Sequence, residues 1–128
     1  MGTLATKLTL TSKNLTSDTL NMSLDKILTV AGDVRLYKTA TSATKANLLL
    51  ASDYGKSYVY LKNLDSSIVI SIGMDTEHDD VIDNDATDIF MTLGPEEFAF
   101  FPWAATYNLH VDAASGTPIL EVGIFEVA

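Results

Sequence analysis

The N-terminal part of the chain alternates apolar and polar positions with a period of two. Successive side chains of a β-strand point to opposite faces, so this alternation predicts strands with one buried face. We therefore expect two half-buried strands at the start of the chain. Their apolar positions are Leu4, Leu8 and Leu10 in the first strand and Leu20, Met22 and Leu24 in the second.

Two β-hairpins are predicted between residues 27 and 72. Each consists of two apolar runs, rich in β-branched or aromatic residues, that are separated by a short turn signal. The first joins residues 27–30 to 34–39 through Gly32-Asp33, and the second joins residues 58–64 to 68–72 through Asp65-Ser66-Ser67.

Further strand signals follow at residues 89–93, 98–103, 107–111 and 119–127, and no window shows a sustained helical period. Short strands with turn signals between them are typical of a β-sandwich or barrel. The pattern predicts one all-β domain over residues 1–128. We expect a two-sheet antiparallel sandwich, jelly-roll-like, with about nine or ten short strands.

Composition narrows the class of protein. The chain has 128 residues, 47% of them hydrophobic, which is typical of a folded domain with one core. It has no cysteine, so neither disulfides nor thiolate metal sites are available. The N-terminal segment does not resemble a signal peptide, and no apolar run approaches bilayer length. We therefore expect no membrane partner and no cleaved leader.

Charge argues against a nucleic-acid partner. The net charge is −9, whereas binding to phosphates rests on Lys and Arg. All eight basic residues precede position 63, giving that part a charge of +4 and the remainder −13. Two interpretations stay open: a polarised surface, or a mixed surface built by strands from both halves.

Acidic residues crowd into residues 75–88. A hard cation such as Ca²⁺ relieves the repulsion between clustered carboxylates, and the candidate ligands are Asp79, Asp80, Asp83 and Asp85. The spacing lacks the glycine and the closing glutamate of an EF-hand loop, so a solvated surface loop is the competing interpretation. The prediction is a surface loop without an assigned metal site.

No residue set points to catalysis. The two histidines are His78 and His110, and His110 shares a strand face with Asn108 and Asp112, which we expect to be solvent-exposed. Nucleophile elbows, phosphate-binding glycine loops and HExxH motifs are missing from the sequence. Seventeen carboxylates leave a glycosidase formally open, but nothing pairs them across a cleft. We expect no enzyme, no catalytic residue and no cofactor.

An aromatic run is the strongest candidate for an interface. Phe98 and Phe100 point to one face of a strand and Phe101 and Trp103 to the other, so both faces are apolar. The strand is either covered on both sides within one subunit or packed on a neighbouring subunit. Because one small sandwich cannot bury both faces, we expect a partner subunit there, with Tyr107 completing the contact.

Three tyrosines alternate with aliphatic residues. If the aliphatics face the core, the tyrosines face outward, where they suit sugar stacking, a protein contact or cross-strand stabilisation. The tyrosines are Tyr37, Tyr58 and Tyr60, and their aliphatic neighbours are Leu36, Val59 and Leu61.

Four segments of the second half resemble small virion proteins of tailed bacteriophages, particularly marine ones. They are YVYLKN at residues 58–63, IFMTLGPEEFAFFPW at 89–103, LHVD at 109–112 and GTPILEVGIFE at 116–126. The resemblance covers about the C-terminal seventy residues. It implies a capsid decoration or cement protein, a head fibre or a tail-associated β-module, commonly a homotrimer, without catalytic residues.

The expected function is therefore structural. We expect a virion protein that self-associates as a trimer, binds the major capsid protein or another virion protein, and is assembled in the host cytoplasm. The alternative is a carbohydrate- or receptor-binding module of a phage fibre or tail. Aromatics at subunit contacts favour the first function, whereas a concave exposed aromatic patch beside the acidic loop favours the second.

Overall fold

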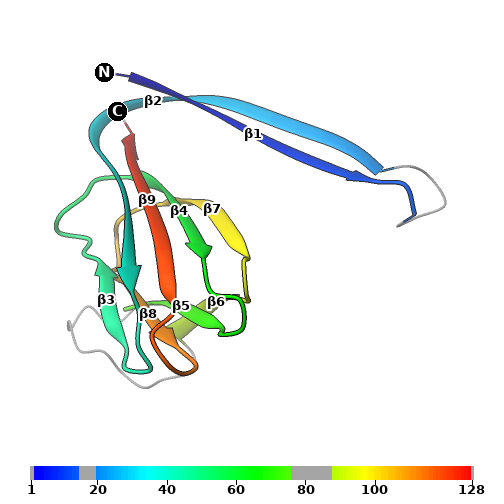
Figure 1. Ribbon diagram of the computed structural model, residues 1–128. Helices are drawn as coiled ribbons and strands as arrows, with labels where there is room; N and C mark the ends of the chain where they lie inside the picture. The colour runs from blue at the N-terminus through cyan, green and yellow to red at the C-terminus, as the bar shows by residue number, and fades with distance from the viewer. Residues whose placement is uncertain (1, 15–19, 76–87, 128) are drawn as a thin grey trace.

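The computed structural model describes residues 2–14, 20–75 and 88–127 (Figure 1). This part of the chain forms nine β-strands. No helix within it is long and apolar enough to cross a membrane. The strands are β1 (Gly2–Ser12), β2 (Leu20–Ala40), β3 (Ala46–Leu49), β4 (Ser57–Asn63), β5 (Ile70–Met74), β6 (Ile89–Leu93), β7 (Phe98–Trp103), β8 (Leu109–Ala113) and β9 (Ile119–Val127).

The strands form two antiparallel sheets. Sheet A has the order β1-β2-β9-β4-β7, and sheet B has the order β3-β8-β5-β6. From β2 onward, chain and sheet order are those of a jelly roll, in which two four-stranded sheets face each other. The predicted fold class is confirmed. Two strands are longer than the short strands expected, because β1 has 11 residues and β2 has 21.

The core lies between the inner faces of the two sheets. β4 shows why these residues form a strand there, because its burial alternates strictly between buried and half-buried positions. Val59 and Leu61 point inward and meet Ile70 and Ile72 of β5 in one apolar cluster. The other buried hydrophobic members of this cluster are Leu49, Leu93, Trp103, Leu109, Val111, Leu120, Val122 and Ile124.

A long arm projects from the sandwich (Figure 1). We define the arm as β1 together with residues 20–30 of β2, which pair along their whole length from Gly2↔Val30 to Ser12↔Leu20. The second half of β2 then pairs with β9, after a register shift between Val30 and Val34. The hairpin predicted around Gly32-Asp33 is wrong, because β2 continues through this dipeptide as one strand.

One face of the arm is apolar. Cross-strand partners share a face, so the register stacks Leu8 on Leu24 and Leu10 on Met22. Toward the tip, the opposite face pairs Lys7 with Asp25, Thr9 with Ser23 and Thr11 with Asn21, whereas nearer the base it pairs Ala5 with Ile27. The strands were predicted correctly, but their expected half-burial is wrong at these apolar positions. Leu8, Leu10, Met22 and Leu24 are exposed, because this face of the arm continues as the outer face of sheet A, which points away from the core.

The second predicted hairpin is an arch between the two sheets. β4 belongs to sheet A and β5 to sheet B, so the two strands do not pair. The polar turn itself was predicted correctly. Asp65 Oδ1 accepts hydrogen bonds from the backbone N–H groups of Ser67 and Ile68, at 2.7 and 2.8 Å. These donors stabilise the charged carboxylate and hold the pKa of Asp65 below its usual range.

Asn63 joins three segments at the end of β4. Its buried side-chain amide donates to the carbonyl oxygens of Ile68, Leu93 and Gly94, at 2.7, 3.0 and 3.1 Å. Its Oδ1 accepts from the backbone N–H of Asp65 at 3.0 Å. One side chain therefore fixes the arch against the turn between β6 and β7.

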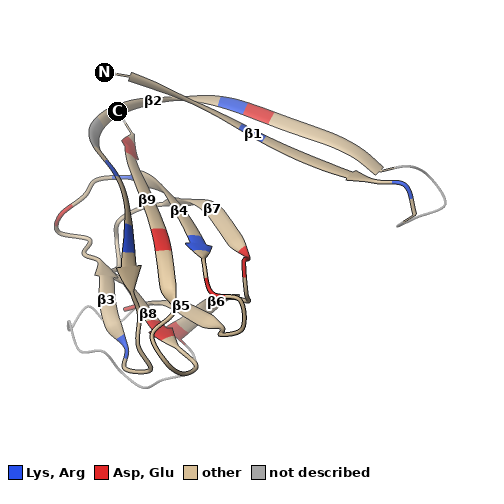
Figure 2. Cartoon of the chain, in the orientation of Figure 1, with Lys and Arg blue, Asp and Glu red and all other residues tan. Residues whose placement is uncertain are grey.

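Charges of both signs are interspersed over the sandwich (Figure 2). On the outer face of sheet A, Lys38 of β2 and Lys62 of β4 are the cross-strand neighbours of Glu121 of β9. Residues from the basic and the acidic part of the sequence thus lie side by side. At this face the mixed interpretation of the charge asymmetry holds.

We predict that Asn63→Ala lowers the free energy of unfolding by about 2–4 kcal/mol, because buried carbonyl oxygens lose their donor. Chemical denaturation followed by tryptophan fluorescence measures this. Asn47→Ala, at an exposed position of β3, is the matched control and should change the free energy by less than about 0.5 kcal/mol. Equal stability of the two variants would contradict the role assigned to Asn63.

Candidate functional site

The outer face of sheet A is unusually apolar for a surface. Hydrogen-bonded register places Leu36, Gly123, Tyr60 and Phe100 in one row across β2, β9, β4 and β7. Leu36 is 68% exposed and Phe98, at the far edge of the same face, is 64% exposed. Phe98 lies in the neighbouring row, beside Lys62 and Glu121, so charged residues border the apolar patch on this side. Exposed apolar patches of this kind often mark interaction sites.

The two tyrosines of β4 lie on this face, as predicted, and contact diagonal neighbours on the adjacent strands. The ring of Tyr58 stacks on Phe100 with centroids 5.5 Å apart. The hydroxyl of Tyr60 donates to Glu121 Oε1 at 2.8 Å. Burial, together with this hydrogen bond and the charge of Glu121, raises the pKa of Tyr60 to about 12. Among the roles left open for them, cross-strand stabilisation is the one that the geometry supports.

The aromatic run of β7 divides as its alternation predicts. Phe98 and Phe100 point outward, whereas Phe101 and Trp103 point toward the core. Trp103 is only 4% exposed, and its Nε1 donates to the carbonyl oxygen of Tyr107 at 3.1 Å. Trp103 therefore offers almost no surface to a partner, which corrects its place among the candidate interface residues.

The inward-pointing aromatic side chains of β7 are packed within the subunit. Phe101 is half-buried and meets the ring of Phe90 edge-on, with centroids 6.0 Å apart. Tyr107 is also half-buried, beside Trp103. One sandwich thus covers the inner aromatic face, and the surface that remains for a partner is that of Phe98 and Phe100.

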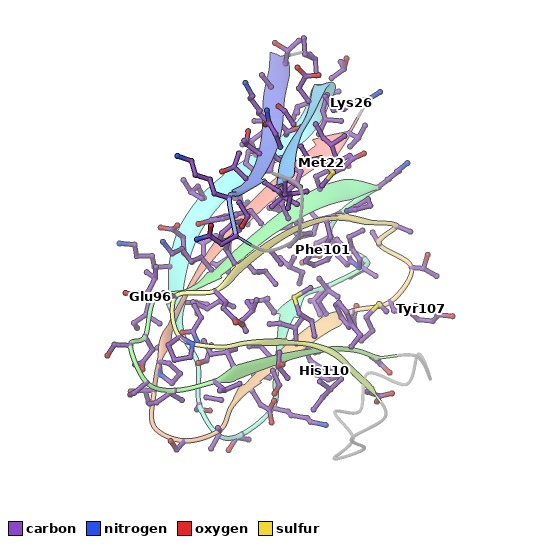
Figure 3. The ribbon with its side chains drawn as sticks, turned by 90° about the vertical axis from the view of Figure 1, so that its right-hand side faces the viewer. Met22, Lys26, Glu96, Phe101, Tyr107 and His110 are labelled. Carbon is purple, nitrogen blue, oxygen red and sulfur yellow. The ribbon has the colours of Figure 1, made fainter. Side chains whose placement is uncertain are left out.

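A groove separates the arm from β7. We call it the arm–β7 groove; its volume is about 540 Å³, and its apolar walls are Leu8 and Leu24 on one side and Phe98 and Phe100 on the other. Figure 3 shows the arm, with Met22 and Lys26, above the sandwich that carries Phe101. Sequence reasoning found Phe98 and Phe100 but missed the groove, because only the bend in β2 brings the arm over β7.

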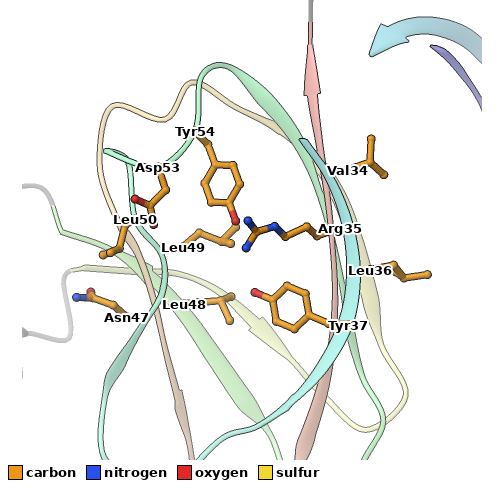
Figure 4. A pocket seen from close by; sticks show the side chains of 10 residues that line it. All are labelled: Val34, Arg35, Leu36, Tyr37, Asn47, Leu48, Leu49, Leu50, Asp53 and Tyr54. Atoms are coloured by element: carbon orange, nitrogen blue, oxygen red, sulfur yellow. The ribbon is translucent and has the colours of Figure 1, made fainter. Parts of the chain in front are cut away.

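A second cleft, of about 800 Å³, opens on the side of the sandwich between β2 and β3 (Figure 4). Arg35 and Tyr54 point toward each other across it, with the guanidinium carbon 6.0 Å from the ring centroid. Tyr37 also points into the cleft, and burial raises the pKa of its hydroxyl. The prediction that Tyr37 faces outward and Leu36 inward is wrong, because the register of β2 gives the reverse.

His110 is buried rather than solvent-exposed, which corrects the prediction for this strand face. It is 3% exposed in the middle of β8, and Asn108 is also buried. Burial is the main cause that lowers the pKa of His110, and the charge of Lys45 acts in the same direction. The charge of Asp88 acts in the opposite direction.

Gly73 of β5 makes room for this histidine. The two residues are cross-strand partners, and a Cβ at Gly73 would meet the imidazole ring and lie 2.8 Å from the carbonyl oxygen of Asp88. His110 is therefore packed into a fitted position in sheet B.

The calcium candidates Asp79, Asp80, Asp83 and Asp85 lie outside the described residues. Within residues 2–14, 20–75 and 88–127, no group of three or more His, Asp or Glu side chains is arranged to hold a metal ion.

Comparisons with known proteins support the fold alone. No protein-family model and no curated protein sequence matches this chain. A solved chain from Bacillus endospore appendages, described as a novel family of disulfide-linked pili, is similar in structure. The TM-score is 0.53 at 8% sequence identity, and the match covers 79% of this chain and 91% of that chain. At this identity the likeness extends to the two-sheet architecture and not to function.

We predict that Trp103→Ala lowers the free energy of unfolding by about 3–5 kcal/mol, the cost of truncating a buried aromatic side chain. Denaturation in urea at low protein concentration measures it. Phe98→Ala, on the outward face of the same strand, should cost less than about 0.5 kcal/mol under these conditions. A stable Trp103→Ala protein that only loses self-association would restore Trp103 to the interface.

The lowered pKa of His110 predicts a loss of stability on acidification. A histidine whose pKa is lower in the folded state binds fewer protons there than in the unfolded chain. The free energy of unfolding should therefore fall as the pH drops below about 6.5, the ordinary histidine pKa. His110→Gln should flatten this dependence in denaturation series across that range. Parallel pH profiles for the two proteins would rule the effect out.

Proposed function

We propose that this chain is a non-enzymatic structural protein of a bacteriophage particle, which decorates the capsid by associating with itself and with the shell. The observation that carries the proposal is the apolar surface shared by the arm and the outer face of sheet A. Leu24, Leu36 and Phe98 are each more than half exposed on it. Surfaces of this kind are stabilised when a protein partner covers them.

The resemblance of the second half to small phage virion proteins supports the assignment to a bacteriophage particle. The jelly roll is also a fold used by viral capsid domains. The similar solved chain belongs to disulfide-linked pili, but disulfide linkage is not open to a chain without cysteine. Self-association of this chain therefore has to occur without disulfides. Exposed leucines and phenylalanines are suited to that.

A second candidate is a carbohydrate-binding module, favoured by the cleft between β2 and β3. The cleft combines the rings of Tyr37 and Tyr54 with the charged side chains of Arg35 and Asp53. Aromatic faces stack on sugar rings, and charged groups bind hydroxyls. Glycan-array binding that disappears in Tyr54→Ala, while self-association persists, would favour this candidate.

The test of the structural proposal uses the purified chain and particles that lack it. We expect light scattering to show a closed homo-oligomer, a trimer as in the resembling virion proteins, and co-sedimentation to show retention on the particles. The double variant Phe98→Ser, Phe100→Ser should lose both properties and remain folded, since both side chains point away from the core. A monodisperse monomer at high micromolar concentration that does not bind particles would contradict the proposal.

A further inference from the structure

The arm lacks the cover that a ribbon of two strands needs. Two-stranded hairpins are only marginally stable in water, and a third strand or a packed layer normally covers their apolar face. In the described residues the arm contacts the sandwich through its base, where Leu28 and Val30 are buried. Toward the tip, Leu10 and Met22 are 40% and 39% exposed.

The arm–β7 groove has apolar walls that a second apolar surface can contact. Its apolar walls are well separated, because Leu24 and Phe98 remain 57% and 64% exposed although they line the same groove. The arm of the same chain therefore overhangs the groove without filling it. An occupant that fits must be elongated and must carry an apolar face.

Charge indicates that the occupant is a second copy of this chain. Residues 1–30 carry three lysines and two aspartates, a net charge of +1, whereas the remaining residues carry −10. The groove itself is lined by Lys7, Asp25 and Lys26 of its own arm, and the exposed Glu96 and Glu97 directly precede Phe98 at its other wall. The arm of a second copy, which carries the exposed Lys13 beside its tip, therefore meets opposite charges on the β7 side of the groove. The arm is also the segment that projects far enough to reach a neighbour (Figure 1).

We propose that the tip of the arm of one copy occupies the arm–β7 groove of a second copy, with Leu10 and Met22 against Phe98 and Phe100. This deepens the proposed function by naming the contact through which the chain self-associates. Such a contact is heterologous, because the arm and the groove are different surfaces, so repetition around a rotation axis closes a ring. A trimer is a ring of this kind.

Site-directed cross-linking tests the contact, because the chain has no cysteine of its own. Met22→Cys and Phe98→Cys proteins, one carrying a larger tag, are mixed and oxidised. We expect a mixed disulfide dimer, since disulfides form only when the two Cα atoms come within about 7 Å. Ser23→Cys is the matched control: it neighbours Met22 but lies on the polar face of the arm, and should give no mixed dimer with Phe98→Cys.

A second pair of variants tests the energetics. Leu10→Asp with Met22→Asp should weaken assembly by about 30-fold or more, as expected when two apolar anchors are lost. Thr9→Asp with Ser23→Asp adds the same charge to the opposite face and should leave assembly within about 3-fold. Thermal unfolding of the sandwich should be unchanged in both, because the arm tip lies outside its core.

The outcomes separate this contact from the broader function. A Met22→Cys protein that cross-links only with itself would mean that arm tips pack on each other, which overturns the groove contact and retains self-association. A monomer that gives no cross-link with either partner would overturn both.

Discussion

The apolar face of β2 is the constraint on which the exposed surfaces of the molecule depend. Apolar side chains recur at even-numbered positions from the arm into the sandwich, and Leu24 and Leu36 both point away from the core. Pairing with β1 over residues 20–30 and with β9 over residues 34–40 fixes this register. Turning the leucines inward would require a shift of one residue, which would bring Arg35 and Tyr37 to the outer face. The chain therefore keeps an apolar surface outside its own core.

The sandwich does not depend on that surface for its stability. Its core is filled by inner-face aliphatics of both sheets and closed by Trp103, and Asn63 fixes the arch that carries the chain from sheet A to sheet B. The side chains that fill the core and the exposed apolar side chains thus lie on opposite faces of sheet A. Substitutions on the outer face should therefore leave the core intact, which lets the proposed association be tested separately from stability.

The two clefts define different chemistries on one small domain. The arm–β7 groove is apolar and is lined by exposed side chains such as Leu8 and Phe98. The cleft between β2 and β3 is bordered by Arg35 and by the hydroxyl groups of tyrosines. Both depend on β2, which contributes its even-numbered positions to the outer face and its odd-numbered positions to the cleft. This separation lets self-association and small-ligand binding be distinguished by experiment.

Much of the local structure is contained in the sequence. The alternation of β4 and the aromatic run of β7 predicted the strands, the class of fold and the split between Phe98 and Trp103, because pleating forces neighbouring side chains to opposite faces. The polar turn at Asp65 was also predictable, because its side chain accepts hydrogen bonds from the backbone N–H groups two and three residues further along the chain.

Tertiary structure decided the facts that depend on distant partners. A turn signal does not say whether its two strands pair or belong to different sheets, so the pattern predicted a hairpin where the chain forms an arch after β4. Polarity alone placed His110 in solvent, whereas the missing side chain of Gly73 on the neighbouring strand allows it to be buried. The alternating leucines of the arm were assigned to a core. Alternation fixes which side chains share a face, but only the packing of the two sheets decides which face is covered.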